Sequence, residues 1–187
     1  TGMLFDASTI DAVASILATV RVPVVVDPVM IATTGAKLLD QNAICAYRPL
    51  IARATVLTPN LPEAQALLDC GTINTRDEML LAANRLLDFG CNAVLLKGDQ
   101  IADLLLIQGA NGIHTRWFET KRLDIRGHGT GCTLASLITA FLARGLDLES
   151  ATAKAIIMLR KALKHAKGIG TGQVHTPDPF FSAYRVR

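Results

Sequence analysis

The sequence contains no apolar run long enough to cross a bilayer, which requires about 20 consecutive apolar residues. Its first residues, Thr1-Gly2-Met3-Leu4, lack the basic region and following apolar stretch of a secretory signal peptide. The formal net charge at pH 7 is only +3, which creates no strong field for nucleic acid or for an acidic membrane surface. We therefore expect neither a membrane nor a nucleic acid as partner.

Paired cysteines are also missing. The four cysteines form no C-x-x-C pair and show no metal-ligand spacing: Cys45, Cys70, Cys91 and Cys132. Three of them lie in apolar stretches, where cysteine behaves as a small hydrophobic residue. This usage is typical of a reducing compartment and predicts a cytoplasmic protein. Cys132 differs because it follows a glycine-rich segment.

The chain has no internal repeat, low-complexity stretch or linker. Hydrophobic residues make up 50% of the sequence and charged residues 19%, which is enough apolar material for a sizeable core. A length of 187 residues fits one domain. We therefore expect residues 1–187 to form a single domain.

Short apolar, β-branched runs alternate along the chain with segments of helical period. Buried strands are expected at residues 24–26, 55–58 and 93–96, and a hairpin at 103–108 and 113–119 around a Gly109–Gly112 turn. Helices are expected at 8–20, 40–53, 61–69, 76–89, 129–144 and 148–167. This alternation predicts an α/β fold with a mainly parallel sheet covered by helices on both faces.

At several expected helix ends, the residue type predicts where the helix begins or stops. Ser8 or Thr9 can serve as the first N-cap, and Pro49 should bend or end the second helix. Gly71 and Gly90 stand where C-terminal stops belong, and no element is expected in the tail after Gly168.

Polar residues follow the expected strands directly. Asp27-Pro28 follows the first strand, Thr58-Pro59-Asn60-Leu61-Pro62-Glu63 the second, and Lys97-Gly98 the third. In parallel sheets, ligands bind at the carboxyl ends of the strands, so these side chains should meet at one rim. Carboxylates beside an ammonium group suit a magnesium polyphosphate.

A glycine-rich segment, residues 127–133, leads straight into an expected helix. The backbone N–H groups of Gly129, Thr130 and Gly131 could line a concavity at the positive end of the helix dipole, forming an anion hole. The alternative is an ordinary glycine-rich turn with Thr130 or Thr133 as helix cap. The segment alone does not separate the two interpretations.

Taken together, four motifs resemble the hydroxymethylpyrimidine and hydroxymethylpyrimidine-phosphate kinases of thiamine biosynthesis, in the ribokinase superfamily. They are Asp-Pro-Val-Met from residue 27, Thr-Pro-Asn-x-x-Glu-Ala from 58, Leu-Lys-Gly from 96 and His-Gly-Thr-Gly-Cys-Thr from 128. The resemblance covers nearly the whole chain. It implies a three-layer αβα sandwich, the cofactors ATP and Mg²⁺, a pyrimidine substrate and a homodimer.

The resemblance also implies roles for the glycine-rich segment. Cys132 matches the base that takes the proton from the substrate hydroxyl, a role open to a thiolate if the helix N-terminus lowers the pKa of the thiol. Gly129, Thr130 and Gly131 would hold the charge of the transferred phosphoryl group. The alternative for Cys132 is a small residue chosen for packing at the start of a helix.

For the other motifs, the resemblance implies metal and nucleotide contacts. Asn60 and Glu63 would organise magnesium and its waters, and Asp27 would help to hold the metal–phosphate end. Lys97 would neutralise an ATP phosphate. Each also has a plainer interpretation: Glu63 suits the first turn of any helix, Asp27 suits a turn before proline, and Lys97 suits a solvated strand end.

The chain also departs from the family pattern. The family begins well before Gly2-Met3-Leu4, so we expect its N-terminal strands and much of its pyrimidine pocket to be absent here. The loop 99–103 is short, and residues 123–127 replace a more polar pattern. Two alternatives therefore accompany the expected pyrimidine kinase: a pyridoxal kinase of the same superfamily, and a non-catalytic remnant that acts as an interaction module.

Overall fold

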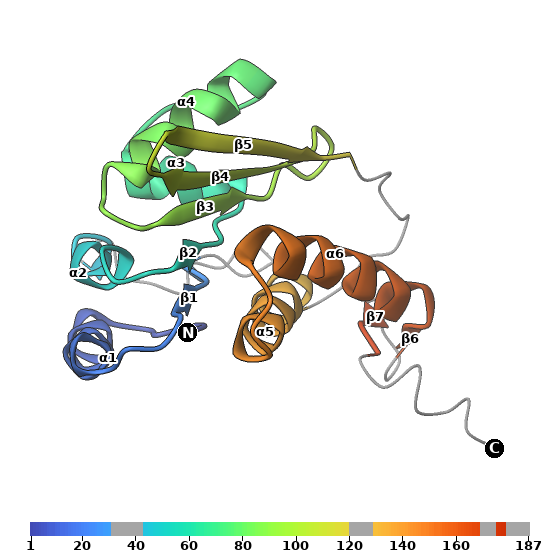
Figure 1. Ribbon diagram of the computed structural model, residues 1–187, viewed down its shortest axis with the longest axis horizontal. Coiled ribbons are helices and arrows are strands. Elements are labelled where there is room, and N and C mark those ends of the chain that lie inside the picture. The colour runs from blue at the N-terminus through green and yellow to red at the C-terminus, as the bar shows by residue number, and fades with distance from the viewer. Residues whose placement is uncertain (31–42, 120–128, 169–174, 179–187) are drawn as a thin grey trace. The chain divides into compact units, whose positions relative to one another are not determined.

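The computed structural model describes residues 1–30, 43–119, 129–168 and 175–178. They belong to two compact units, Thr1–Thr120 and Lys121–Arg187, each with its own helices and strands (Figure 1). The start of the expected helix 40–53 and the segment 123–128, with His128, lie outside the described residues. The single domain expected from the sequence stays a prediction.

The first unit is built on a five-stranded sheet in the order β1-β2-β3-β4-β5 (Figure 1). β1 (Val25–Val26), β2 (Val56–Leu57) and β3 (Ala93–Leu96) run parallel. β4 (Asp103–Gly109) and β5 (Gly112–Phe118) add an antiparallel hairpin beside β3, closed by the facing pair Gly109 and Gly112. The predicted strands and hairpin are thus confirmed.

Four helices share one hydrophobic core with one face of this sheet. They are α1 (Ala7–Thr19), α2 (Tyr47–Ile51), α3 (Leu61–Leu68) and α4 (Arg76–Leu87). The sheet contributes alternate residues to this core, as the period of two in a strand requires: Val24, Val26, Leu57, Val94, Leu96, Leu104 and Leu106.

The opposite face of the sheet is apolar as well. Its side chains are also buried: Val25, Val56, Ala93, Leu95 and Leu105. Strands that are apolar on both faces belong to α/β folds in which helices cover both sides of the sheet. The α/β class predicted from the sequence is therefore confirmed.

Three helix ends differ from the predictions. Asp6, and not Ser8 or Thr9, caps α1, because its Oδ1 accepts a hydrogen bond of 2.8 Å from the Thr9 N–H. The left-handed residue after α3 is Asp69, with φ 46°, so the helix stops before Gly71. Pro49 lies inside the first turn of α2, where a missing N–H costs no helical hydrogen bond, and it does not end the helix.

The second unit pairs α5 (Thr130–Ala143) with α6 (Leu148–Lys164), joined by a turn in which Gly145 has φ 82°. The helix expected over 148–167 ends at Lys164, and residues 167–168 form a strand. This strand, β6 (Lys167–Gly168), pairs antiparallel with β7 (His175–Thr176), an element that the sequence did not predict. The tail also contacts α6, since the Asp178 N–H donates to the Ala162 carbonyl at 3.1 Å.

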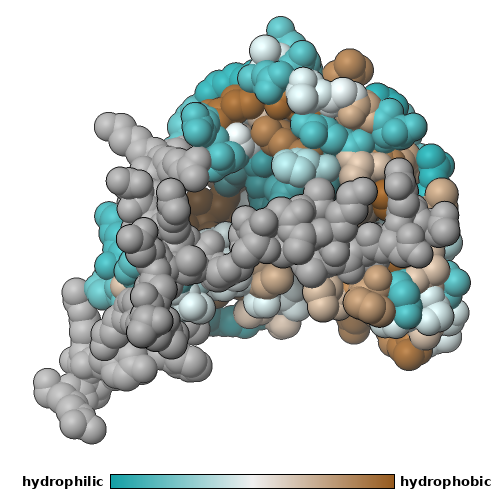
Figure 2. All heavy atoms as spheres, turned by 180° about the vertical axis from the view of Figure 1, so that it is seen from behind, coloured by the Kyte–Doolittle hydropathy of each residue, from teal (hydrophilic) through white to brown (hydrophobic). Residues whose placement is uncertain are grey.

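Within the described part of the chain, no helix combines the length and the apolar character needed to cross a membrane. Hydrophilic and hydrophobic residues are interspersed on the face shown in Figure 2. Some large hydrophobic side chains are nevertheless exposed, among them Met3, Phe5, Leu81 and Ile157.

Candidate active site

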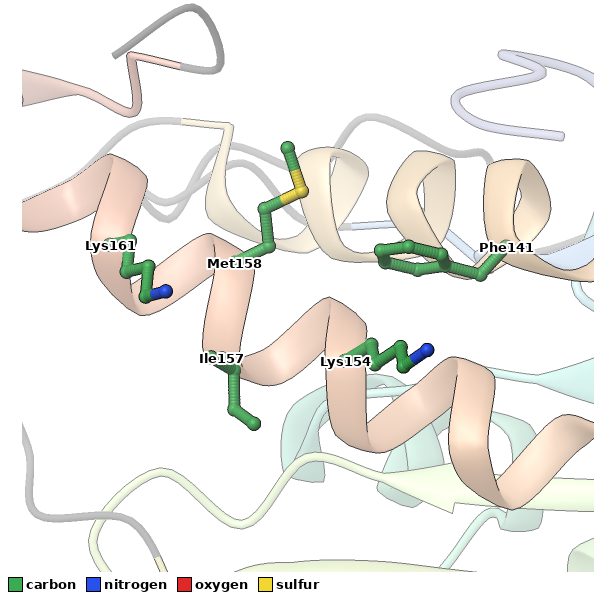
Figure 3. Close-up of a pocket in the computed structure, with 5 residues that line it drawn as sticks. All are labelled: Phe141, Lys154, Ile157, Met158 and Lys161. Atoms are coloured by element: carbon green, nitrogen blue, oxygen red, sulfur yellow. The ribbon is translucent and has the colours of Figure 1, made fainter. Parts of the chain in front are cut away.

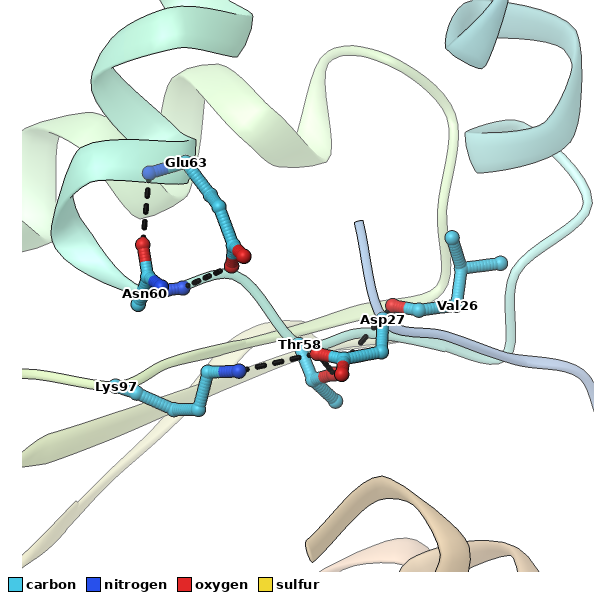
Figure 4. A network of polar contacts seen from close by, with 6 residues as sticks. All are labelled: Val26, Asp27, Thr58, Asn60, Glu63 and Lys97. Carbon is cyan, nitrogen blue, oxygen red and sulfur yellow. Dashed lines mark hydrogen bonds and ion pairs between the residues drawn. The ribbon is translucent and has the colours of Figure 1, made fainter. Parts of the chain in front are cut away.

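Asp27 lies directly after β1 and is almost fully buried, with 2% of its surface exposed. Its Oδ1 accepts two hydrogen bonds, one from Thr58 Oγ1 at 2.9 Å and one from Lys97 Nζ at 3.0 Å (Figure 4). The carboxylate is therefore fixed from two neighbouring strand ends. A buried carboxylate held in this way is suited to act as a charged ligand.

Lys97 follows β3 and extends its side chain toward Asp27 (Figure 4). Its backbone N–H donates to the Pro59 carbonyl at 2.9 Å, and Lys97 forms a parallel bridge with Asn60. Its side chain is 16% exposed. The ends of β1, β2 and β3 thus meet, as the sequence predicted, and the ammonium group keeps limited access to solvent.

Asn60 and Glu63 form a capping box at the start of α3. The Glu63 N–H donates to Asn60 Oδ1 at 2.8 Å, and the Asn60 N–H donates to Glu63 Oε2 at 2.8 Å (Figure 4). Glu63 is only 3% exposed, and burial raises the pKa of its carboxyl, while Lys97 and the Asn60 N–H act in the opposite direction. Both carboxylates of the site are consequently buried and rigidly held.

These residues fit a magnesium ion that keeps most of its waters. Asp27 and Glu63 carry two acidic groups, and Lys97 supplies one ammonium group to balance them. No cluster of three or more His, Cys, Asp or Glu side chains suited to a metal occurs among the described residues. A site with one or two carboxylates is what Mg²⁺ uses when phosphates and water complete its shell.

The burial of Glu63 should change how the stability of the protein depends on pH. Because its pKa is raised in the folded state, the folded protein holds this proton more tightly than the unfolded chain does. The contribution of Glu63 to stability should therefore fall as the pH rises from the ordinary glutamate pKa through the folded-state pKa. Glu63→Gln should remove this fall, so that the melting temperature of the variant gains on that of the wild type as the pH rises above about 4, the ordinary glutamate pKa.

Glu78 is a matched control for this experiment. It occupies the same position in the capping box of α4, but it is exposed, and hydrogen bonds from Asn74 and Thr75 lower its pKa. Its contribution is present above the unfolded pKa and is lost as the pH falls, so Glu78→Gln should lose stability relative to the wild type as the pH rises. The same trend in both variants would contradict the assignment of Glu63 as a buried acid.

Gly98, directly after Lys97, begins a tight turn. Its N–H donates to Asp103 Oδ1 at 3.1 Å, and its carbonyl accepts from the Ile101 N–H at 2.9 Å. Burial raises the pKa of the Asp103 carboxyl, which the Gly98 N–H and Lys97 oppose. The side chain of Asp103 thus closes the short loop expected from the sequence, and it interacts electrostatically with Lys97.

We expect Gly98→Ala to destabilise the protein strongly. A Cβ atom at this position would lie 1.9 Å from the Ala102 carbonyl oxygen and 2.7 Å from Met79 Cε. Overpacking of this kind costs about 1–3 kcal/mol and occasionally more. Urea denaturation measures the loss, with Gly71→Ala as control, because no atom lies within 4 Å of a Cβ placed there. Equal stabilities of the two variants would contradict the tight turn.

The predicted anion-hole residues lie in the second unit, at the start of α5. Gly129 is the N-cap, with φ 74°, a left-handed conformation that favours glycine, and no side chain of the described residues caps this helix. Thr133 Oγ1 donates to the Gly129 carbonyl at 2.7 Å, and the alternative of Thr130 or Thr133 as helix cap is not found among the described residues. Helix N–H groups without a cap are available to an anion.

Cys132 lies in the first turn of α5, two residues after Thr130, and its side chain is exposed. It therefore stands at the positive end of a 14-residue helix. Its role as a base stays a prediction, as do those of Gly129, Thr130 and Gly131.

A pocket on the second unit contains none of the predicted site residues. Phe141 of α5 contributes an aromatic ring, and α6 contributes two lysines and two apolar side chains (Figure 3): Lys154, Ile157, Met158 and Lys161. The hydrogen bonds that join Asp27, Thr58, Asn60, Glu63 and Lys97 belong to the first unit.

Three residues around the candidate site were not predicted from the sequence. In the sequence, Thr58 only begins a motif, Asp103 belongs to a short loop, and Tyr47 stands in no motif. The tyrosine is fully buried in α2, and its pKa is raised to about 12, first by this burial and then by the charges of Glu63 and Asp27. Only Thr58 had a visible signal, because it directly follows a buried strand.

Comparison with solved structures identifies the class of this fold. The pyridoxal kinase from Staphylococcus aureus, in complex with pyridoxal, matches 100% of this chain and 67% of its own, with a TM-score of 0.83 and 29% identity. The same enzyme in complex with AMP-PCP and pyridoxal matches with a TM-score of 0.80 and 28% identity. The chain therefore has the ribokinase-like fold of these small-molecule kinases, as predicted.

The chain belongs to the phosphomethylpyrimidine kinase family, whose sequence model matches residues 1–177. It is 38% identical over 182 residues to the hydroxymethylpyrimidine/phosphomethylpyrimidine kinase of Synechococcus elongatus, covering 92% of this chain and 67% of that protein. It is 40% identical over 176 residues to the thiamine biosynthesis bifunctional protein ThiED of Geobacter sulfurreducens, of which it spans 36%. The resemblance inferred from the motifs is thereby confirmed.

Proposed function

We propose that the protein carrying this chain phosphorylates 4-amino-5-hydroxymethyl-2-methylpyrimidine and its monophosphate with ATP, for thiamine diphosphate biosynthesis in the cytoplasm. The observation that carries the proposal is the buried cluster of Asp27, Lys97, Asn60 and Glu63 at the ends of three parallel strands. In a member of this kinase family, that cluster has the charges and donors that a magnesium–nucleotide complex needs.

In this proposal, the first unit handles the metal and the nucleotide. Magnesium, when bound, would neutralise charge on the phosphates. Glu63 and Asn60 would orient its waters, and Asp27 would hold the metal–phosphate end. Lys97 Nζ has three N–H donors, so it would donate one to a phosphate oxygen while another stays with Asp27. Its limited exposure allows this contact without leaving Asp27 unpaired.

The second unit would supply the groups that act during transfer. The N–H groups of Gly129, Thr130 and Gly131 would stabilise the phosphoryl group while the bond to the ADP oxygen breaks and the bond to the substrate oxygen forms. Cys132, as a thiolate, would accept the proton of the substrate hydroxyl. Support for these roles comes from the uncapped start of α5 and from the family motif.

Pyridoxal is a second candidate substrate. A pyridoxal kinase that was solved with pyridoxal matches the whole of this chain. The named sequence relatives of higher identity are pyrimidine kinases, which is why the pyrimidine is preferred here. A homodimer stays a prediction that light scattering can measure.

Binding and turnover test the proposal together. Isothermal titration should detect AMP-PCP binding that requires Mg²⁺. ADP release, with mass spectrometry of the product, should give a higher kcat/KM for the pyrimidine and its monophosphate than for pyridoxal. The reverse preference would favour the pyridoxal kinase. Absence of nucleotide binding by the folded protein would reject the kinase and favour an interaction module.

A further inference from the structure

The side-chain hydroxyl of Thr58 contacts the candidate site directly. Thr58 lies right after β2 with 1% of its surface exposed, and its Oγ1 is 2.9 Å from Asp27 Oδ1 and 3.5 Å from the Val26 carbonyl oxygen (Figure 4). A hydroxyl has one proton to donate. The carboxylate oxygen is the closer acceptor and it is charged, which makes the hydrogen bond to it the stronger one. The proton therefore goes to Asp27.

The pairing of the strands does not depend on this hydrogen bond. The backbone N–H of Thr58 already donates to the Val26 carbonyl at 2.9 Å, which continues the pairing of β1 with β2. At the other end of β2, Thr55 uses its hydroxyl for the backbone, because its Oγ1 accepts the Val24 N–H at 2.9 Å. Of these two threonines, only Thr58 directs its hydroxyl to a carboxylate.

The oxygen that accepts the Thr58 proton also accepts Lys97 Nζ at 3.0 Å. The two donors differ in how firmly they are held. Thr58 is short and stiff at its first side-chain torsion, whereas Lys97 has a long side chain that is 16% exposed. In the proposed function Lys97 also donates to a phosphate oxygen, so Thr58 is the donor that serves Asp27 alone. Both bonds end on Oδ1, and neither uses Oδ2.

We propose that Thr58 is a positioning residue: its hydroxyl holds Asp27 by Oδ1 and so leaves Oδ2 to the hydrated magnesium and its phosphates. This inference rests on the proposed kinase function. Residues that hold a metal-binding carboxylate from outside change metal affinity by roughly 10- to 100-fold. Thr58 acts through Asp27 and does not itself touch the nucleotide.

Thr58→Val tests the inference, because valine keeps the branched shape of the side chain and has no proton to donate. The measurement is a Mg²⁺ titration in the presence of AMP-PCP, followed by thermal unfolding and by isothermal titration of the nucleotide. We expect the half-saturating Mg²⁺ concentration to rise about 10-fold or more. Thr58→Ser, which keeps a hydroxyl at this position, should stay close to the wild-type value.

Thr55→Val is the matched control. It removes a hydroxyl hydrogen bond at the opposite end of the same strand, so it should lower the melting temperature and leave the Mg²⁺ dependence unchanged. Thr58→Ala and Thr58→Ser form a second comparison, because these two variants differ only by the hydroxyl. The alanine variant should need about 10-fold more Mg²⁺ than the serine variant, so the test does not depend on the folding of one protein.

An unchanged Mg²⁺ dependence in Thr58→Val, or equal dependences in Thr58→Ala and Thr58→Ser, with a normal wild-type response, would overturn the inference and leave the kinase proposal intact. A shift of the same size in Thr55→Val would also overturn it, because the loss would then come from a general loosening of β2. No Mg²⁺ response in the wild type would reject the kinase proposal, and the inference with it.

Discussion

Cys132→Ala is expected to lower kcat for pyrimidine phosphorylation by about 10²- to 10⁴-fold, the usual contribution of a positioned general base. AMP-PCP affinity should change little, because the N–H groups at the start of α5 belong to the backbone and remain. Cys132→Asp should keep part of the activity, since a carboxylate can also accept the proton. Steady-state kinetics with the pyrimidine and titration with AMP-PCP separate the two effects.

Cys45→Ala is the control for this experiment. Cys45 is likewise exposed, and it lies outside the glycine-rich segment. Its replacement should leave kcat within about twofold of the wild type, in line with the small effects of most surface substitutions. If Cys132→Ala retained full activity, Cys132 would be a packing residue at a helix start.

Lys97→Met should produce the largest loss of stability. It leaves Asp27, which is 2% exposed, as a buried charge without its ammonium partner. Breaking a buried ion pair in this way costs about 3–5 kcal/mol. At about 2–4 °C per kcal/mol for a chain of this size, the melting temperature should fall by roughly 6–20 °C. Scanning calorimetry measures this fall directly.

The double variant Asp27→Asn/Lys97→Met should regain much of this loss, because the unpaired charge is removed as well. Glu119→Gln is the surface control: Glu119 pairs with Arg76 where both side chains are well exposed, and such pairs contribute about 0–1 kcal/mol. Equal losses for Lys97→Met and Glu119→Gln would show that the Asp27–Lys97 pair behaves as a surface pair.

The polar cluster could be predicted because its members directly follow apolar strands. Asp27, Asn60 and Lys97 each come within three residues of a strand end, and parallel strands bring such positions together. The hairpin was equally predictable, since Gly109 and Gly112 enclose its two-residue turn. These features depend on neighbours in sequence and on one general rule of sheet topology.

Other features depend on contacts that a linear pattern does not contain. Tyr47 has the pattern of an ordinary core residue, because Leu50 and Ile51 on the same helix are also buried. Its place in the core that the four helices share with the sheet arises only from tertiary packing. Asp103 looks like the polar first residue of a strand, and its hydrogen bond with the Gly98 N–H follows from the tight turn.

The capping box at α3 has a consequence for which cation the site can accept. Glu63 Oε2 already accepts the Asn60 N–H, and Asn60 Oδ1 accepts the Glu63 N–H, so a cation that drew both side chains into direct contact would strain the first turn of α3. Ca²⁺ gathers six to eight oxygen ligands directly, whereas Mg²⁺ can be held through its own waters. We therefore expect the start of α3 to favour hydrated over dehydrated cations, since a cation that gathers many direct oxygen ligands would pull on the side chains that hold the helix start together.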